Sequence, residues 1–165
     1  MANITLGGTP THTSGELPTV GQQAPNAVLT KTDMSSCSIQ DFTGKNVVLN
    51  IFPSVDTGVC AQSIRTFNKE AAGMNNTAVL CISKDLPFAQ QRFCGAEGIE
   101  NVHMLSDYKT GEFGANYGAT VMEGAFEGLL SRAVVVIDPQ GKVAYTEQVP
   151  EIGQEPNYQA ALAVI

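Results

Sequence analysis

The residue with the clearest capacity for chemistry is Cys60. It follows Asn46 to Phe52, an almost continuous apolar run that Pro53 ends, and an apolar stripe with helical spacing begins near Gly58. We therefore expect Cys60 in the first turn of a helix, at the carboxyl end of a buried strand, where α/β sheets place their functional sites. The free N–H groups and the positive dipole end of such a helix stabilise an anion, so the sulfur is expected to react as a thiolate.

Two neighbours of Cys60 could support this chemistry. Thr57 lies three residues earlier and can turn its hydroxyl toward the sulfur. Pro53 has no N–H group, so it can shield the pocket without competing for hydrogen bonds.

Other interpretations of Cys60 stay open when only the residues are considered. Cys60 also heads the apolar stripe that continues through Ile64 and Phe67, and free cysteines are among the most buried side chains, so by position alone packing is the commoner role. A Cys/His acyl-transfer enzyme would use Cys60 as nucleophile and His103 or His12 as base. A non-catalytic thioredoxin-like binding module, in which all the thiols only pack, is the third possibility.

The spacing Pro53-x3-Thr57-x2-Cys60 resembles the active-site signature of the peroxiredoxins. A second motif, Asp85 to Gln90 followed by Arg92 to Gly95, resembles the bacterial thiol peroxidases, which are atypical two-cysteine peroxiredoxins. The similarity extends from about Val20 to Ile165.

The resemblance implies a role for each residue of the site. Cys60 would be the peroxidatic cysteine with Pro53 and Thr57 as its supports, and Cys94 would be the resolving cysteine. The family also keeps an arginine beside the sulfur, and Arg132, just before the apolar run 133–137, occupies that place. An arginine at the start of a strand is otherwise most often a surface charge.

These residue types suit peroxide reduction. A thiolate attacks the terminal peroxide oxygen, and negative charge builds on the departing oxygen. Arg132 is always cationic and can stabilise both the thiolate and that oxygen. The product is a sulfenic acid, which condenses with a second thiol.

The resemblance further implies reduction of hydrogen peroxide and organic hydroperoxides, recycling by thioredoxin, a homodimer and no cofactor. The implied disulfide joins Cys60 to Cys94, which lies 34 residues later. A disulfide requires Cα atoms within about 7 Å. If the folded helices hold the sulfurs further apart, the segment Leu86 to Gly95 must unwind, and Phe88 and Phe93 would anchor it in the reduced state.

The remaining cysteines and histidines carry no recognisable site. Cys81 sits within an apolar strand and is expected to pack in the core, and Cys37 in a polar run has no functional context. His12 and His103 are isolated and no cysteines form a C-x2-C pair, so zinc and thioredoxin-type dithiol chemistry are not expected.

The elements that must position Cys60 follow an α/β order. Buried strands are expected at 46–52, 77–83 and 133–138, with a hairpin partner at 142–146. Helices are expected from 58, from 87 to 95 and from 157 to 165. This order predicts a thioredoxin-like sandwich with a mixed central sheet and helices on both faces, although a flavodoxin-like sheet would give a similar pattern. Residues 1–25 are expected to add a hairpin extension with apolar contacts at Ile4, Leu6 and Val20.

Composition limits the function classes. A length of 165 residues predicts one domain, and 43% hydrophobic against 15% charged residues can build a sizeable core. The net charge of −7 disfavours binding to nucleic acid. No apolar run approaches the roughly 20 residues that a membrane span needs, and no signal peptide is recognisable, so a cytoplasmic protein is expected.

Overall fold

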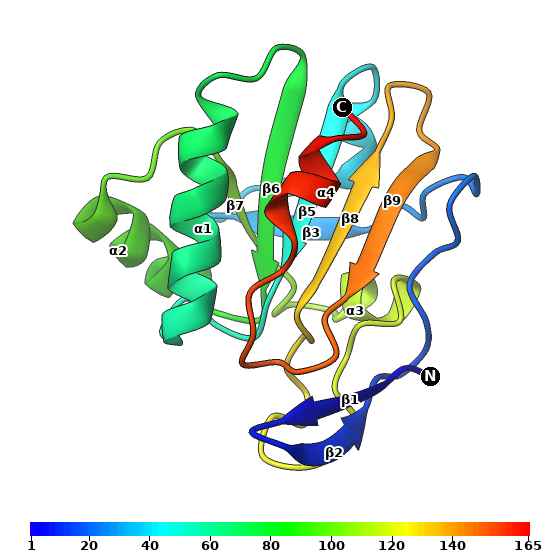
Figure 1. Cartoon of the computed structure of the whole chain (residues 1–165). Helices are drawn as coiled ribbons and strands as arrows, with labels where there is room; N and C mark the ends of the chain where they lie inside the picture. The colour runs from blue at the N-terminus through cyan, green and yellow to red at the C-terminus, as the bar shows by residue number, and fades with distance from the viewer.

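The computed structural model describes residues 1–165 and is built around one seven-stranded mixed sheet (Figure 1). The central strands β5, β6 and β7 are parallel, whereas β8 pairs antiparallel with β5 and β3 antiparallel with β7. From one edge to the other, the strands are β4 (Ser36–Ser38), β3 (Val28–Lys31), β7 (His103–Ser106), β6 (Thr77–Ser83), β5 (Asn46–Ile51), β8 (Ala133–Ile137) and β9 (Val143–Gln148). The antiparallel β8 beside β5 excludes the flavodoxin-like alternative.

Helices cover both faces of the sheet, as the sequence predicts. Side chains from α1 (Gly58–Ala71), α2 (Pro87–Glu97) and α4 (Tyr158–Leu162) share one apolar cluster with one face of the central strands. The other face packs against α3 (Glu112–Asn116) and the short 3-10 helix η1 (Ile39–Phe42). Successive side chains of β5 point to opposite faces of the sheet, so Val48 belongs to the first apolar cluster and Leu49 to the second. The predicted thioredoxin-like sandwich is confirmed.

The last helix is shorter than the predicted 157–165. It begins after Asn157, whose side chain accepts a hydrogen bond from the Ala160 amide, and it ends at Leu162. Val164 and Ile165 remain 43% and 40% exposed, so little burial is available to stabilise another turn.

Within residues 1–25, β1 (Asn3–Leu6) and β2 (Thr9–His12) form an antiparallel hairpin below the main sheet (Figure 1). Ile4 is buried against Val121 and Ile152, so the hairpin packs on two later loops. The expected apolar contact at Val20 is wrong, because Val20 lies in a surface turn and is 57% exposed.

The register of β8 positions the reactive end of the sheet. Ile51, the last residue of β5, lies opposite Ala133, the first residue of β8. The segment that enters α1 therefore leaves the sheet beside the chain that enters β8. This antiparallel pairing brings residues 60 and 132 together although they are 72 positions apart.

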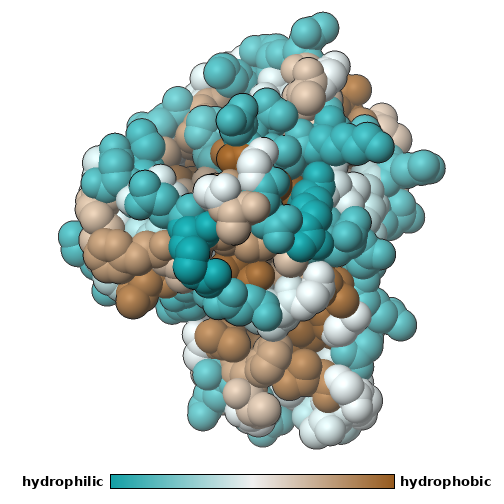
Figure 2. All heavy atoms as spheres, turned by 90° about the vertical axis from the view of Figure 1, so that its left-hand side faces the viewer, coloured by the Kyte–Doolittle hydropathy of each residue, from teal (hydrophilic) through white to brown (hydrophobic).

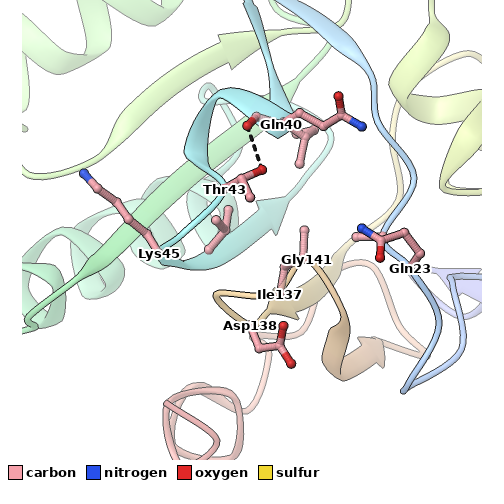
Figure 3. Close-up of a pocket in the computed structure, with 10 residues that line it drawn as sticks. Gln23, Gln40, Thr43, Lys45, Ile137, Asp138 and Gly141 are labelled. Carbon is pink, nitrogen blue, oxygen red and sulfur yellow. Dashed lines mark hydrogen bonds between the residues drawn. The ribbon is translucent and has the colours of Figure 1, made fainter.

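The opposite end of β5 carries a small hollow of about 30 Å³ (Figure 3). Lys45 and Gln40 line it with Asp138, and the Thr43 hydroxyl donates to the Gln40 carbonyl at 2.8 Å. Cys60 lies beyond the other end of this strand, in α1. None of the helices is both long and apolar enough to cross a lipid bilayer.

Candidate active site

Cys60 is fully buried in the first turn of α1, and its sulfur contacts a cation. The Nη2 of Arg132 donates to Cys60 Sγ at 3.0 Å. Neither Cys37, Cys81 nor Cys94 has such a partner. The structure thus brings together the predicted nucleophile and the predicted arginine.

The guanidinium of Arg132 is only 2% exposed and is held in place by the backbone. Its Nε donates to the Ile152 carbonyl, and its Nη1 is buried without a hydrogen-bond partner. No carboxylate lies within ion-pair distance. A buried cation needs a compensating anion, and a Cys60 thiolate is the group placed to supply it. The Nη1 group remains a free donor.

Thr57 and Pro53 shape the turn that leads into α1. Pro53 is buried directly after β5. Thr57 occupies the N-cap position, and its hydroxyl donates to the Ser54 carbonyl at 3.1 Å instead of to the sulfur. The expected contact between Thr57 and the thiol is therefore absent, but the lone pairs of the hydroxyl oxygen stay free to accept. The amide N–H of Cys60 also has no acceptor in the protein.

A pocket of about 140 Å³ opens onto this site. Its polar positions are Thr57 and Arg132, and its walls include apolar side chains from four separate segments, Leu6, Val59, Phe126 and Ile152. Figure 2 shows apolar side chains gathered on the protrusion that the hairpin of β1 and β2 forms beneath the main body. The pocket is therefore lined by two polar side chains and four apolar ones.

Cys94 lies in the last turn of α2, half-buried against the same apolar cluster as Cys60. Burial raises the pKa of its thiol. Cys60 and Cys94 are not joined by a disulfide in this structure. Phe93 anchors α2 in the core, but Phe88 is 64% exposed, so its predicted anchoring role is wrong.

Comparisons with known proteins agree with this geometry. The redoxin family model matches residues 19–162. A thiol peroxidase from Mycobacterium tuberculosis is 59% identical over 165 residues, which span 100% of this chain and 99% of that protein. The chain belongs to the peroxiredoxin-type thiol peroxidases of the redoxin family. A thiol peroxidase from Corynebacterium glutamicum is 53% identical over 100% of this chain and 99% of its own length.

A solved structure shares the whole fold of this thiol peroxidase. A peroxiredoxin-like protein from Aquifex aeolicus superimposes with a TM-score of 0.93 at 39% identity. The match covers 99% of this chain and 96% of that protein. The hairpin and the loops around Cys60 lie within this shared region.

The other two cysteines lie apart from the site of this peroxidase. Cys81 is fully buried in β6, where burial raises the pKa of its thiol to about 12. Cys37 is buried in the edge strand β4, where burial and the nearby Asp41 raise the pKa of its thiol. Both thiols are therefore held in the neutral form and pack in the core.

Neither histidine contacts Cys60. His103 packs edge-on against Phe42 with ring centroids 5.0 Å apart, and His12 Nδ1 lies 3.1 Å from the Glu123 carboxylate. Burial and the nearby cations Lys31 and Lys45 lower the pKa of His103. The site holds no imidazole base for an acyl-transfer reaction.

The sequence did not single out two carboxylates that brace the site. The sequence places Asp85 in the second motif without giving its side chain a role. In the structure it lies before α2, and its carboxylate accepts hydrogen bonds from the Ser54 hydroxyl and the Val55 amide. Glu151 binds the turn of the N-terminal hairpin, one residue before Ile152. Asp85 lies within a recognisable motif, so its position was a usable signal, whereas nothing local marks Glu151.

Proposed function

We propose that this thiol peroxidase uses Cys60 as the peroxidatic nucleophile and Cys94 as the resolving thiol, with Arg132, Thr57 and Pro53 supporting Cys60. The observation that carries the proposal is the contact of 3.0 Å between Arg132 Nη2 and Cys60 Sγ, made by a buried guanidinium without a carboxylate partner. Its substrates are hydrogen peroxide and organic hydroperoxides.

In the first step, the Cys60 thiolate attacks the terminal oxygen of the peroxide. An S–O bond forms, the O–O bond breaks, and the departing oxygen takes a proton and leaves as water or an alcohol. The cysteine is oxidised to a sulfenic acid while the peroxide is reduced. Arg132 Nη1 and the Cys60 amide are the free donors for the peroxide oxygens, and the Thr57 hydroxyl oxygen is a free acceptor for its proton.

In the second step, the Cys94 thiolate attacks the sulfenic sulfur and displaces the oxygen, which leaves as water. Cys60 is buried in α1 and Cys94 is half-buried in α2, so the end of α2 must open for the two sulfurs to meet. Opening also exposes the Cys94 thiol, whose pKa burial raises in the folded helix.

The pocket supports organic hydroperoxides as substrates. Leu6, Val59 and Phe126 lie on its walls, and an alkyl substituent there would be removed from water. Hydrogen peroxide needs only the polar side chains of Thr57 and Arg132.

The partners in this proposal are a dithiol reductant, thioredoxin, and a second copy of the chain in a homodimer, in the cytoplasm. The Cys60–Cys94 disulfide needs an external dithiol to return to two thiols. Leu86 and Phe88 at the start of α2 are 51% and 64% exposed and are available to a partner protein. Membership of the peroxiredoxin-type peroxidases is what supports thioredoxin and the homodimer.

The test is to mix reduced protein with one equivalent of peroxide, count the free thiols, and map the linked peptides without reduction. Two thiols should be lost, and Cys60 should be joined to Cys94 within one chain. No loss of thiols would contradict the nucleophile. A link from Cys60 to Cys37 or Cys81, or a link between chains, would contradict the role of Cys94.

A further inference from the structure

The Asp85 carboxylate binds the loop that leads to Cys60. This residue follows β6, and its carboxylate accepts hydrogen bonds from the Ser54 hydroxyl at 2.7 Å and from the Val55 amide at 2.8 Å. No cation pairs with it. The charge is thus stabilised by hydrogen-bond donors, two of which come from the turn between β5 and α1.

The same carboxylate is connected to α2 through Ser83. The Ser83 hydroxyl donates to Asp85 at 2.7 Å and accepts from Gln90 Nε2 at 3.2 Å. Gln90 is a fully buried residue of α2, and its Nε2 also donates to the Leu105 carbonyl at 2.9 Å. A continuous chain of hydrogen bonds therefore runs from α2 through Gln90, Ser83 and Asp85 to the Cys60 loop.

We propose that Asp85 is a positioning residue that fastens the Cys60 loop to the start of α2. We call the hydrogen-bond chain from Gln90 through Ser83 and Asp85 to the Cys60 loop the latch. While these hydrogen bonds are intact, the loop holds Cys60 against Arg132, and α2 stays folded with Cys94 away from Cys60. When α2 opens for disulfide formation, Gln90 leaves Ser83 and the loop loses its support at the same time. This inference rests on the proposed roles of Cys60 and Cys94 and adds a coupling between their two segments.

The latch predicts opposite effects on the two chemical steps. Asp85→Asn keeps the size of the side chain but replaces one of its two acceptor oxygens with an NH2 group, which cannot accept a hydrogen bond. Since Ser54 and Val55 donate to different oxygens of Asp85, the variant loses one of these two hydrogen bonds. Cys60 should then sit less well against Arg132, and peroxide attack should slow. The start of α2 should open more readily, and disulfide formation should accelerate.

A second contact between the same two segments provides the matched control. Arg92 of α2 donates to the Asp56 carboxylate at 2.9 Å, but the two side chains are 60% and 63% exposed. Exposed pairs of this kind contribute little. Asp56→Asn therefore removes a charge from the same loop without opening the latch.

The experiment measures each step after a single addition of hydrogen peroxide. The first rate, that of peroxide attack on Cys60, is measured by competition with a reference peroxidase for the added peroxide. The second rate, that of disulfide formation, is measured by acid quenching and mass spectrometry of the Cys60–Cys94 link. We expect Asp85→Asn to lower the first rate about tenfold and to raise the second several-fold. Asp56→Asn should leave both within about twofold of the wild-type rates.

A purely structural role for Asp85 would change both rates in the same direction, and that result, or two unchanged rates, would overturn the inference. If Asp85→Asn does not fold, Ser54→Ala removes one donor of the latch and must give the same opposite shifts on a smaller scale. A wild-type protein that never forms the Cys60–Cys94 link would overturn the proposed function together with the inference that rests on it, whereas a wild-type protein that forms the link while the Asp85 variant fails to show opposite shifts would overturn the inference alone.

Discussion

Arg132 has a single side-chain partner, and that partner is the sulfur of Cys60. The contrast with Arg65 makes this clear. Arg65 binds the Glu97 carboxylate through two nitrogens at 3.0 and 3.1 Å, with 43% of its side chain exposed. Arg132 has no such carboxylate, and its orientation depends on the Ile152 carbonyl. Its charge is therefore available to the thiolate and to the departing oxygen.

We predict that Arg132→Ala slows peroxide reduction, because it removes the buried cation that contacts the Cys60 sulfur. A hydrogen bond to a charged group contributes about 1.5–3 kcal/mol, which corresponds to roughly a ten- to hundredfold loss in rate. The second-order rate with peroxide is the measurement. Arg65→Ala is the matched control and should leave this rate unchanged. An unaltered rate in a folded Arg132 variant would contradict the assigned role.

We predict that Cys60→Ser abolishes peroxidase activity, whereas His103→Ala retains almost all of it. Attack on peroxide requires a thiolate but no imidazole base, and His103 contacts Phe42 instead of Cys60. Peroxide consumption is measured alongside circular dichroism, which checks folding. A folded but inactive His103 variant would favour the acyl-transfer hypothesis instead.

At the residue scale, the sequence predicted that Cys60 and Arg132 lie together, but not which groups hold them in place. Cys60 follows a strand and opens a helix, and both patterns are local. The Ile152 carbonyl and the Asp85 carboxylate act through loops that meet only in the folded protein. Thr57 shows the same limit, because its local geometry turns the hydroxyl to Ser54 instead of to the sulfur.

At the scale of elements, α2 combines few anchors with a reactive thiol near its end. Only Pro87, Gln90 and Phe93 of its 11 residues are buried, and the helix ends at Gly98, which adopts a left-handed conformation with φ of 66°. Short helices depend on tertiary contacts. Loss of the Phe93 contact would therefore free the segment that carries Cys94 without disturbing the central sheet.

We predict that Cys94→Ser consumes one equivalent of peroxide and then stops as a sulfenic acid. In the wild-type protein, amides of residues 86–95 should exchange with solvent faster in the oxidised form than in the reduced form, because the disulfide requires the helix to open. Mass spectrometry of the variant and hydrogen exchange of the wild type are the measurements. Cys81→Ser serves as the control and should still form the disulfide. Equal exchange in both redox forms would show that resolution needs no unwinding.

The sequence predicted the long elements better than the short ones. The strand β6 and the start of α1 follow continuous apolar patterns and lie where expected. The strands β3 and β4 and the helix α3 were not predicted, since they have only 4, 3 and 5 residues and gain their stability from the sheet that they complete. The two unpredicted strands β4 and β3 lie at one side of the sheet, away from the site beside β5 and β8.

At the scale of the whole molecule, the N-terminal hairpin is tied to the site through Glu151. The carboxylate of Glu151 accepts hydrogen bonds from the Thr5 hydroxyl at 2.8 Å and from the Gly7 and Gly8 amides at 3.2 and 2.9 Å. Both glycines have a positive φ, which lets their two N–H groups face one carboxylate. The next residue is Ile152, whose carbonyl holds Arg132. One loop thus fixes the hairpin on one side and the guanidinium on the other.

We call the hydrogen bonds between the Glu151 carboxylate and the N-terminal hairpin the clamp. The clamp does not change with pH near neutrality. Hydrogen bonds from the amides of Gly153 and Gly8 and from the Thr5 hydroxyl lower the pKa of Glu151 to about 2. A carboxylate with a lowered pKa contributes its full stabilisation above its ordinary pKa, near 4.3, and loses it only as the pH falls through about 2. The ionised form therefore persists at neutral pH.

We predict that Glu151→Ala selectively impairs the reduction of bulky organic hydroperoxides. The hairpin contributes Leu6 to the apolar wall of the pocket, so loosening it removes surface that an alkyl group would contact, whereas hydrogen peroxide needs only the polar side chains of Thr57 and Arg132. We expect kcat/KM to fall about three- to tenfold for a bulky hydroperoxide and less than twofold for hydrogen peroxide. The ratio of these two losses should be the same at every pH from about 5 to 8, because Glu151 stays ionised throughout this range. Glu155→Ala removes a carboxylate that contacts only Tyr158 and should leave both values unchanged. Equal losses for both substrates would instead mean that Glu151 acts through the Ile152 carbonyl on Arg132, and that the hairpin does not select the substrate.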